Sequence, residues 1–198
     1  MSFAEMLRTE FRELALDIPA FSQQQLALYA KEIEHWNKAV NLTSLAGPAL
    51  VRRLIIDPVW IGQHLQMSGV MTDVGSGNGS PGIPLTITRK FSSTNLIEPR
   101  MKRAAFLRHV IGKVRLTDVA VHRCRIEEMP EKSLFSDWIT LQAIDPTPAL
   151  IEDLRRIAID TTRVVWITST QSAPTPKASR IDIEGGRPVA WVFQLDQF

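Results

Sequence analysis

Residues Val70–Pro84 read VMTDVGSGNGSPGIP, and this stretch decides the fold that the sequence predicts. Apolar residues on either side of Thr72 indicate a short buried strand, and Asp73 lies where we expect that strand to end. Four glycines then remove side chains where the backbone turns tightly or approaches a ligand: Gly75, Gly77, Gly79 and Gly82. Pro84 suits the first turn of a following helix. Ligands related to nucleotides bind at such strand–turn–helix junctions in open α/β sheets, so the stretch predicts a binding site.

The glycine-rich turn matches two cofactor patterns. Gly77–Gly82 fits G-x-G-x-x-G, the dinucleotide fingerprint, which is weak evidence by itself. Asp73–Gly79, an acidic residue followed by G-x-G-x-G, resembles the S-adenosylmethionine loop of Rossmann-like methyltransferases. Because a carboxylate repels a pyrophosphate but attracts an ammonium and a sulfonium, Asp73 favours S-adenosylmethionine over a dinucleotide. A purely structural turn is the third alternative, which the conformational entropy of four glycines disfavours.

Composition and charge limit the class of protein. The chain has 198 residues, 44% of them apolar, which is enough for one domain with a sizeable core and an appendage. Its net charge is +2, so affinity for nucleic acid must come from local clusters of Lys and Arg. Cys124 is the only cysteine, which excludes an intramolecular disulfide framework and suits a reducing compartment. The sequence has neither a signal-peptide pattern nor a run of about 20 apolar residues, and we expect a cytoplasmic protein.

Helical spacing dominates residues 1–65, which we expect to form an N-terminal helical extension. Apolar residues at helical spacing predict a first helix in residues 3–14. Ser22 followed by Gln25 predicts the N-cap of a second helix. A third helix follows, which Pro58 is expected to kink or end.

Residues 66–198 alternate strand and helix patterns, the mark of a parallel sheet, and are expected to form one S-adenosylmethionine-binding domain. After the first strand, further strands are predicted at 94–98, 119–123, 137–141 and 163–169. Helices are predicted at 101–112 and 149–159. Alternating apolar residues near the end predict a hairpin with its turn at Gly185-Gly186. The predicted fold is therefore a Rossmann-like α/β sheet of class I methyltransferase type, with helices on both faces and a C-terminal antiparallel hairpin.

Four motifs, in order along residues 26–140, resemble one bacterial family. His35–Leu45 contains W-N-K-x-x-N-L-T, and Asp73–Leu85 fits D-V-G-[ST]-G-x-G-x-P-G-I-P-L. Lys102–Leu107 fits K-R-x-x-F-L, and Arg125–Glu128 fits R-x-E-E. Together these residues resemble the small-subunit ribosomal RNA guanine-N7 methyltransferases, also called glucose-inhibited division protein B. The first two motifs are specific together, and the similarity fades toward the C-terminus.

The resemblance implies methyl transfer from S-adenosylmethionine to N7 of a guanine in ribosomal RNA. Guanine N7 already presents an acceptor lone pair, so the reaction needs in-line positioning of the two reactants rather than a general base. The sequence accordingly has no evident catalytic triad, and its histidines lack ligand-like spacing, so we expect no metal. The expected partner is ribosomal RNA or the small ribosomal subunit, bound by a monomer or a weak dimer.

Site residues follow from the motifs and the expected strand ends. Glu98, which ends the second strand, is predicted to accept the ribose hydroxyls of the cofactor, and Asp73 to face its ammonium group. The predicted cofactor-binding residues are Asp73, Gly75, Ser76, Gly77, Gly79, Pro81, Gly82, Glu98, Ile126 and Glu127. Asn41, expected at the end of the second helix, and Arg125 are the candidate catalytic residues. The candidate RNA-binding cations are Arg52, Arg53, Lys102 and Arg103.

Three positions depart from the family pattern, and each lost side chain is polar or cationic. The pattern R-H-x-x-D-S reads Arg53–Pro58 here, without its His and Ser. An expected R-A pair is Gln142-Ala143, and an expected Lys-Gly is replaced by Thr168-Ser169-Thr170. Because the cofactor loop is intact, the alternative hypothesis is a degenerate paralogue that binds the cofactor or RNA without efficient catalysis. An ordinary C-cap role for Asn41 and a solvated helix face for the cations are the structural alternatives.

Overall fold

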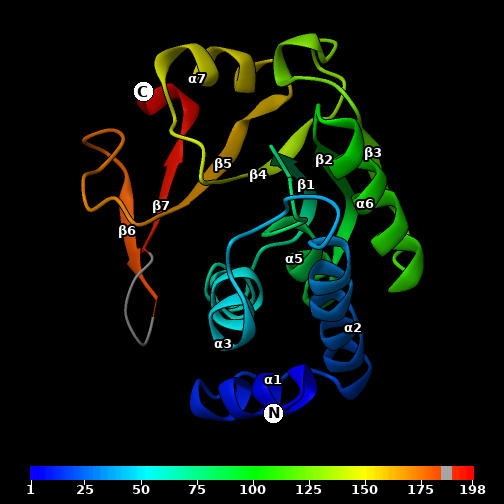
Figure 1. Cartoon of the computed structure of the whole chain (residues 1–198). Coiled ribbons are helices and arrows are strands. Elements are labelled where there is room, and N and C mark those ends of the chain that lie inside the picture. Colours follow the sequence, from blue (N-terminus) through cyan, green and yellow to red (C-terminus); the bar gives the residue numbers. More distant parts are fainter. Residues whose placement is uncertain (184–188) are drawn as a thin grey trace.

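Parallel strands form the centre of the molecule (Figure 1), a computed structural model that describes residues 1–183 and 189–198. Within these ranges the strands make one seven-stranded sheet in the order β3-β2-β1-β4-β5-β7-β6. The strands are β1 (Gly69–Val74), β2 (Phe91–Ile97), β3 (Val119–His122), β4 (Ser136–Gln142), β5 (Ala158–Thr168), β6 (Ser179–Asp182) and β7 (Val189–Gln194). The first five are parallel, whereas β7 is antiparallel to both β5 and β6. The predicted sheet with a C-terminal antiparallel hairpin is confirmed, while the expected Gly185-Gly186 turn lies outside the described residues.

Helices connect and cover these strands. The α-helices are α1 (Phe3–Glu13), α2 (Ala20–Trp36), α3 (Gly47–Val51), α4 (Asp57–His64), α5 (Gly82–Thr88), α6 (Met101–Lys113) and α7 (Pro148–Arg155). Short turns of other helix types are η1 (Arg52–Ile56), η2 (Ile126–Glu128) and η3 (Leu195–Gln197). The end of α7 at Arg155 differs from the prediction, because β5 begins at Ala158 with a polar, exposed stretch that does not alternate like a half-buried strand.

Each face of the sheet packs against its own helices, as predicted. On one face, Met71 and Val165 belong to a cluster with Ile61 of α4 and Leu85 of α5. On the other face, Val74, Ile139 and Val164 pack with the buried side chains of α7. Side chains alternate along each strand, so the residue at 73 faces the side of α4 and α5.

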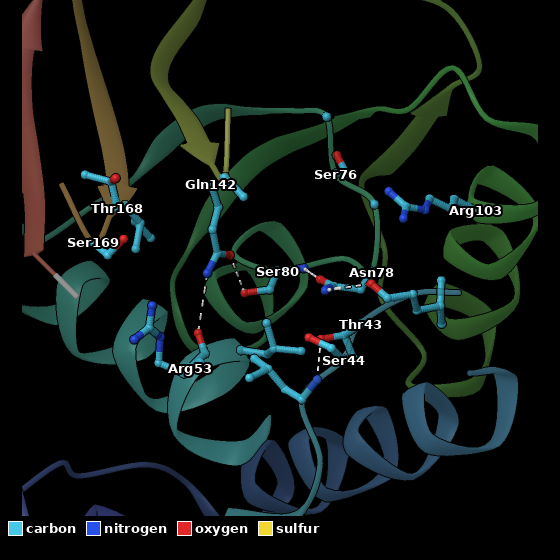
Figure 2. A pocket seen from close by; sticks show the side chains of 17 residues that line it. Thr43, Ser44, Arg53, Ser76, Asn78, Ser80, Arg103, Gln142, Thr168 and Ser169 are labelled. Atoms are coloured by element: carbon cyan, nitrogen blue, oxygen red, sulfur yellow. Dashed lines mark hydrogen bonds between the residues drawn. The ribbon is translucent and has the colours of Figure 1, made fainter. Parts of the chain in front are cut away.

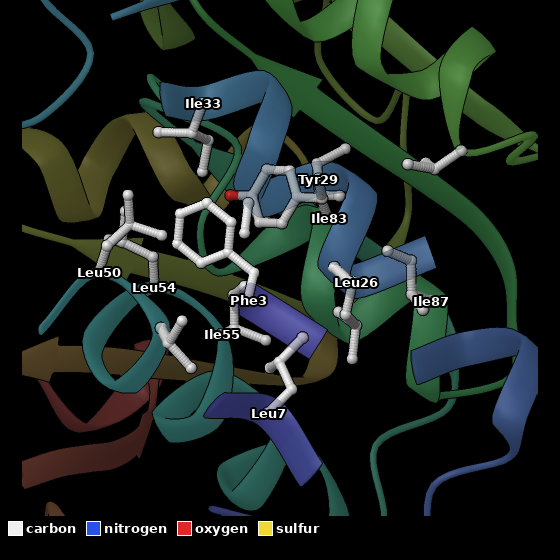
Figure 3. Packing of buried hydrophobic residues seen from close by; sticks show 14 of the residues in the cluster. Phe3, Leu7, Leu26, Tyr29, Ile33, Leu50, Leu54, Ile55, Ile83 and Ile87 are labelled. Carbon is white, nitrogen blue, oxygen red and sulfur yellow. The ribbon is translucent and has the colours of Figure 1, made fainter. Parts of the chain in front are cut away.

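The helical extension shares a hydrophobic core with the sheet-associated helix α5 (Figure 3). Phe3 and Leu7 of α1, Tyr29 of α2 and Ile55 of η1 lie in one buried cluster with Ile83 of α5. Fully burying one such side chain stabilises a fold by about 2 kcal/mol. This shared core fixes the extension relative to the glycine-rich turn that precedes α5.

Helix α2 begins and ends earlier than the sequence predicts. It begins at Ala20, and the predicted N-cap at Ser22 is wrong, because the Ser22 hydroxyl instead donates to the Ile87 carbonyl of α5 (3.2 Å). It ends at Trp36. The expected position of Asn41 at the helix end is therefore also wrong, and Asn41 lies in the loop that follows.

A π-turn, η1, joins α3 to α4 just before Pro58. The amide of Asp57 donates to the carbonyl of Arg52, five residues earlier, instead of to Arg53. Pro58 has no N–H to donate and is the second residue of α4. The predicted disturbance of the helix at Pro58 thus takes the form of a widened turn, and the chain remains helical through it.

Candidate functional site

A cavity of about 460 Å³ lies at the carboxyl ends of β1, β4 and β5 (Figure 2). One wall is the glycine-rich turn after β1, and the opposite wall is the loop after α2 together with the π-turn. The lining segments are 42–45, 53–54, 75–78 with Ser80, 142–143 and 167–169, and Arg103 completes the lining. The cavity therefore lies at the edge of the sheet where the sequence predicts a binding site.

The glycine-rich turn adopts backbone angles that other residues rarely tolerate. The φ angle is +73° at Gly75, +48° at Gly77 and +92° at Gly79. The amides of Gly75 and Ser76 both donate to the carbonyl of Ile97 (2.9 and 3.0 Å), which holds the turn against the end of β2. Gly75 and Gly77 consequently expose backbone to the cavity, beside the side chains of Ser76, Asn78 and Ser80.

Asp73 lies beneath this turn rather than at the mouth of the cavity. Only 1% of the residue is exposed, and its Oδ1 accepts a hydrogen bond from the Thr140 hydroxyl (2.7 Å). Among the described residues Oδ2 has no hydrogen-bond partner, and a Cβ on Gly82 would come within 3.0 Å of it. Burial raises the pKa of Asp73 to about 6, against the opposing effect of the bond from Thr140. The carboxylate of Asp73 therefore lies directly under the turn, and the absence of a side chain at Gly82 leaves space for its Oδ2.

Glu98 directly follows β2, and each of its carboxylate oxygens accepts a backbone hydrogen bond. Its Oε2 accepts from the Gly77 amide (2.9 Å) and its Oε1 from the Arg100 amide (2.8 Å). Glu98 is 3% exposed and therefore ties the glycine-rich turn to the start of α6. Each oxygen keeps a further lone pair that a ligand hydroxyl can use.

The opposite wall depends on one side chain at the end of α2. The Oδ1 of Asn37 accepts from the amides of Leu42 (2.8 Å) and Thr43 (3.1 Å), and its Nδ2 donates to the Thr43 carbonyl (2.8 Å). The Thr43 hydroxyl in turn accepts from the Leu45 amide (3.1 Å). These bonds pin the loop and present Thr43 and Ser44 to the cavity. Sequence reasoning missed this role, although an Asn at a helix end is a known capping signal.

Asn78 joins the two walls. Its carbonyl accepts from the Tyr29 hydroxyl (3.0 Å), its Nδ2 donates to the Leu42 carbonyl (3.4 Å), and its Oδ1 accepts from the Ser80 amide (3.0 Å). Burial raises the pKa of Tyr29 well above its ordinary value, so the hydroxyl keeps the proton that it donates. The glycine-rich turn is thus hydrogen-bonded to α2 and to the loop after it.

Gln142 makes a second connection across the cavity. Its Oε1 accepts from the Ser80 hydroxyl (2.9 Å), and its Nε2 donates a long hydrogen bond to the Arg53 carbonyl (3.5 Å; Figure 2). Ser80 belongs to the glycine-rich turn and Arg53 to the π-turn. The sequence indicates Gln142 only as a departure from the family pattern, and neither contact was predicted.

The π-turn gives two neighbouring arginines different surroundings. Arg52 donates from Nη1 to Oε2 of Glu10 (2.7 Å) and from Nε to Oδ1 of Asp57 (3.0 Å). The Nε of Arg53 is 3.8 Å from Oδ2 of Asp57, and Arg53 lines the cavity. Asp57 is 1% exposed, and burial raises its pKa to about 6 against the effect of both arginines. Of these two predicted RNA-binding cations, Arg53 lies at the cavity and Arg52 ties α1 to the π-turn.

The start of α6 contributes one cation to the cavity. Arg103 lines it, and its Nη2 donates to the Asn41 carbonyl (2.9 Å). Lys102 is exposed and borders a neighbouring hollow of about 350 Å³ together with Asn41. The candidate catalytic residue Asn41 therefore lies outside the main cavity, because α2 ends at Trp36.

The turn after β3 stands apart from the cavity. Ile126 is 7% exposed and packs in the cluster of α7, while the exposed Arg125 has its Nη1 3.7 Å from Oε1 of Glu127. None of these three residues lines the cavity. Of the predicted site residues, those brought together there are Arg53, Gly75, Ser76, Gly77 and Arg103.

Within residues 1–183 and 189–198, no three His, Cys, Asp or Glu side chains group in a way that could hold a metal ion. Burial raises the pKa of the Cys124 thiol, so its nucleophilic thiolate form is disfavoured. No described helix combines the length and the apolar character needed to cross a membrane.

Comparison with known proteins matches the chain to one family. A family model described as rRNA small subunit methyltransferase G matches residues 22–182. Ribosomal RNA small subunit methyltransferase G of Serratia proteamaculans is 39% identical over 126 residues, which cover 63% of this chain and 61% of that protein. The proteins of the same name from Klebsiella pneumoniae and Cronobacter sakazakii are 36% and 35% identical, over 65% and 68% of this chain. The aligned part of the chain spans 61%, 62% and 67% of the length of these three relatives.

Two solved structures with a similar fold are methyltransferases by name. The C-terminal domain of precorrin-6Y C5,15-methyltransferase from Rhodobacter capsulatus superposes with a TM-score of 0.52 at 17% identity, over 79% of this chain and 95% of that one. The corresponding enzyme from Geobacter metallireducens gives 0.51 at 14% identity, over 77% and 90% of the two chains. At these identities the likeness concerns the fold alone, and it agrees with the predicted class I methyltransferase sheet.

Proposed function

The chain belongs to the rRNA small subunit methyltransferase G family, and on that premise we propose that it transfers a methyl group from S-adenosylmethionine to RNA of the small ribosomal subunit. The cavity is the observation that carries the proposal. All the residues that line it lie within residues 22–182, the segment that the family model matches. A glycine-rich turn with small and polar side chains forms one wall, and polar and cationic side chains line the other.

The residues around the turn suit S-adenosylmethionine, which when bound supplies a methyl group activated by a sulfonium. We assign Gly75, Ser76, Gly77 and Gly79 to close backbone contact with this cofactor, since a side chain on the three glycines would strain the turn. Glu98 is assigned to the ribose hydroxyls through the lone pairs that its two amide contacts leave over.

Asp73 is assigned an indirect role in cofactor binding. Above its pKa of about 6 it carries a negative charge directly under the turn, and this charge favours a cationic ligand over a pyrophosphate. Pro81 and Gly82 complete the assigned set by starting α5 over this carboxylate. Ile126 and Glu127 are proposed to border the adenine, on the far side of Glu98 from the cavity.

The finer proposal is that N7 of a guanine accepts the methyl group. N7 presents its lone pair without prior loss of a proton, so the chain has to orient the base and exclude water rather than supply a general base. The cavity offers hydroxyl groups for that task from Thr43, Ser44, Thr168 and Ser169. This assignment moves the acceptor site from Asn41 and Arg125 to the residues that line the cavity.

The RNA is proposed to approach across the cationic edges of the cavity. Arg53 and Arg103 lie at opposite sides of it (Figure 2), and Lys102, next to Arg103 on α6, borders the neighbouring hollow. Contacts of this kind with phosphates supply most of the sequence-independent affinity for RNA. The proposed partner is free ribosomal RNA or the small subunit, which implies a cytoplasmic location, and the proposed state is a monomer or a weak dimer.

A methyl-transfer assay tests the function. Small ribosomal subunits from a bacterium that lacks this modification are incubated with the protein and S-adenosylmethionine carrying a labelled methyl group. We expect label in the small-subunit RNA, and strand cleavage after reduction and aniline treatment, which reports 7-methylguanosine. Label without such cleavage would keep the methyl transfer and refute N7.

Two matched glycine variants control the assay. Gly77→Ala places a side chain in the turn at a φ of +48°, whereas Gly112→Ala does so on α6, where no atom lies within 4 Å of the new carbon. We expect Gly77→Ala to lower the rate of methyl transfer by about tenfold or more and Gly112→Ala to leave it unchanged. Calorimetric binding of S-adenosylhomocysteine by a wild-type protein that transfers no label would instead support the degenerate paralogue.

A further inference from the structure

We propose that Gln142 is a positioning residue that sets the separation between the glycine-rich turn and the π-turn across the cavity. The effect of Gln142 on the reaction rests on the proposed methyl transfer. The bridge itself rests only on the two hydrogen bonds of its side chain. Gln142 is the last residue of β4, and its side chain reaches one partner on each wall (Figure 2).

The first partner is a helix carbonyl that the local sequence deprives of its usual backbone donors. In a regular helix the carbonyl of Arg53 would accept from the amide of Asp57, and in a π-turn from the amide of residue 58. The Asp57 amide donates to Arg52 instead, and Pro58 has no amide hydrogen. The Nε2 of Gln142, 3.5 Å away, supplies a donor from another strand.

The second partner anchors the other end of the bridge. The Ser80 hydroxyl donates to Oε1 of Gln142 (2.9 Å), and Ser80 is only 6% exposed. A primary amide suits both contacts, because it carries a donor and an acceptor on one planar group. Pro58 and Gln142 are both departures from the family pattern, and the structure connects them through one carbonyl.

The bridge matters for the reaction because the two walls hold different reactants in the proposed function. The cofactor lies on the glycine-rich turn, and the RNA approaches past Arg53. In-line transfer depends on their mutual placement, and a shift of about 1 Å can cost up to a hundredfold in rate. Gln142 thus acts through Ser80 and the π-turn and need not touch the transferred methyl group.

A double-mutant cycle between Gln142→Met and Pro58→Ala tests the inference. Methionine keeps the length and shape of glutamine without its polar atoms, and Pro58→Ala restores a backbone amide that can serve the Arg53 carbonyl. In the wild-type background we expect Gln142→Met to lower the melting temperature by about 3 °C. We expect it to lower kcat about tenfold while the KM for RNA and the Kd for S-adenosylhomocysteine stay within about threefold. In the Pro58→Ala background the loss of melting temperature should shrink, because the Arg53 carbonyl keeps a donor, whereas the loss of kcat should remain, because the two walls are no longer linked.

The outcomes separate the inference from the proposed function. Equal losses of melting temperature in both backgrounds would overturn the bridge, whether or not the protein is active. A lowered melting temperature with unchanged kcat would overturn the positioning role, and a wild-type protein without methyl transfer would overturn the proposed function. If Pro58→Ala does not fold, a cycle between Ser80→Ala and Gln142→Met replaces it. Non-additive losses support the bridge there, and additive losses overturn it.

Discussion

The two walls of the cavity are built on different physical grounds. The wall after β1 is specified by residue type, because glycines with φ between +48° and +92° form a turn whose amides bond to the end of β2. The wall after α2 is specified by a single side chain, Asn37, which pins a loop of ordinary residues through three hydrogen bonds. A change in the first wall alters the backbone itself, whereas a change in the second releases a loop.

The largest contrast is expected between one glycine in each wall region. Gly79→Ala adds a carbon at φ +92° that would lie 2.8 Å from Cγ1 of Ile83 and 3.3 Å from the Tyr29 hydroxyl. Gly47→Ala adds one at φ +51° with nothing within 4 Å. We expect Gly79→Ala to lower the free energy of unfolding by about 3 kcal/mol, from backbone strain plus overpacking. Gly47→Ala should cost about 1 kcal/mol from strain alone.

Urea denaturation of both variants measures the contrast. Each variant is compared with the wild type at the same pH, and the slope with denaturant should stay constant. Equal losses in the two variants would mean that the glycine-rich wall is no more tightly packed than the start of α3, and the distinction between the walls would fail.

The sequence predicts the first wall well because its residue types restrict the backbone conformation locally. An apolar strand, four glycines and Pro84 at a helix start leave few conformations open, and the sheet order follows from the alternation of strands and helices. The predicted end of the first strand at Asp73 was less accurate. The strand continues one residue further, to Val74, and the carboxylate points to the face that α5 covers.

The second wall resisted prediction because its contacts join distant segments. Asn37 and Asn41 share helical spacing, so the pattern places both on one helix face, yet the chain leaves the helix at Trp36. Gln142 and Asn78 acquire their roles only when β4, the glycine-rich turn and the helical extension meet. Local sequence propensity does not indicate which distant segments come into contact, and a family motif identifies residues without giving their contacts.

Two buried carboxylates, one associated with each wall, provide a second contrast. Asp73 and Asp57 both have a pKa raised to about 6, and burial is the first cause in each case. Between the ordinary value of 3.8 and about 6, the folded protein keeps protons that the unfolded chain has released. Each group therefore lowers stability as pH rises through this window. We expect Asp73→Asn and Asp57→Asn each to reduce the fall in stability between about pH 4 and 6.

At pH 8 the two substitutions should differ. Asp57 is the partner of Arg52 and Arg53, so Asp57→Asn leaves two half-buried cations less well compensated and should cost about 2 kcal/mol. The Thr140 hydroxyl that donates to Asp73 is a neutral group, so Asp73→Asn should cost less than about 1 kcal/mol. Chemical denaturation from pH 4 to 8 measures both effects, and a larger loss at Asp73 would contradict the assignment of the arginine network to the second wall.

The most selective expected effect on function concerns the pinned loop. Asn37→Ala removes three hydrogen bonds at a solvent-accessible helix end and should cost about 1 kcal/mol. Because Thr43 and Ser44 would then no longer be held at the cavity, we expect the KM for RNA to rise about fivefold while the Kd for S-adenosylhomocysteine changes little. Steady-state methyl transfer and calorimetry give the two constants.

Asn41→Ala is the matched control in the same loop. The Asn41 side chain is exposed, and Arg103 contacts only its carbonyl, which the substitution keeps. Stability and KM should stay close to wild-type values, within about 0.5 kcal/mol for the former. If Asn41→Ala instead abolished methyl transfer in a folded protein, the reacting base would have to lie at the hollow beside α6. The loop would then contribute to catalysis through the Asn41 side chain, and not through the backbone conformation that Asn37 holds in place.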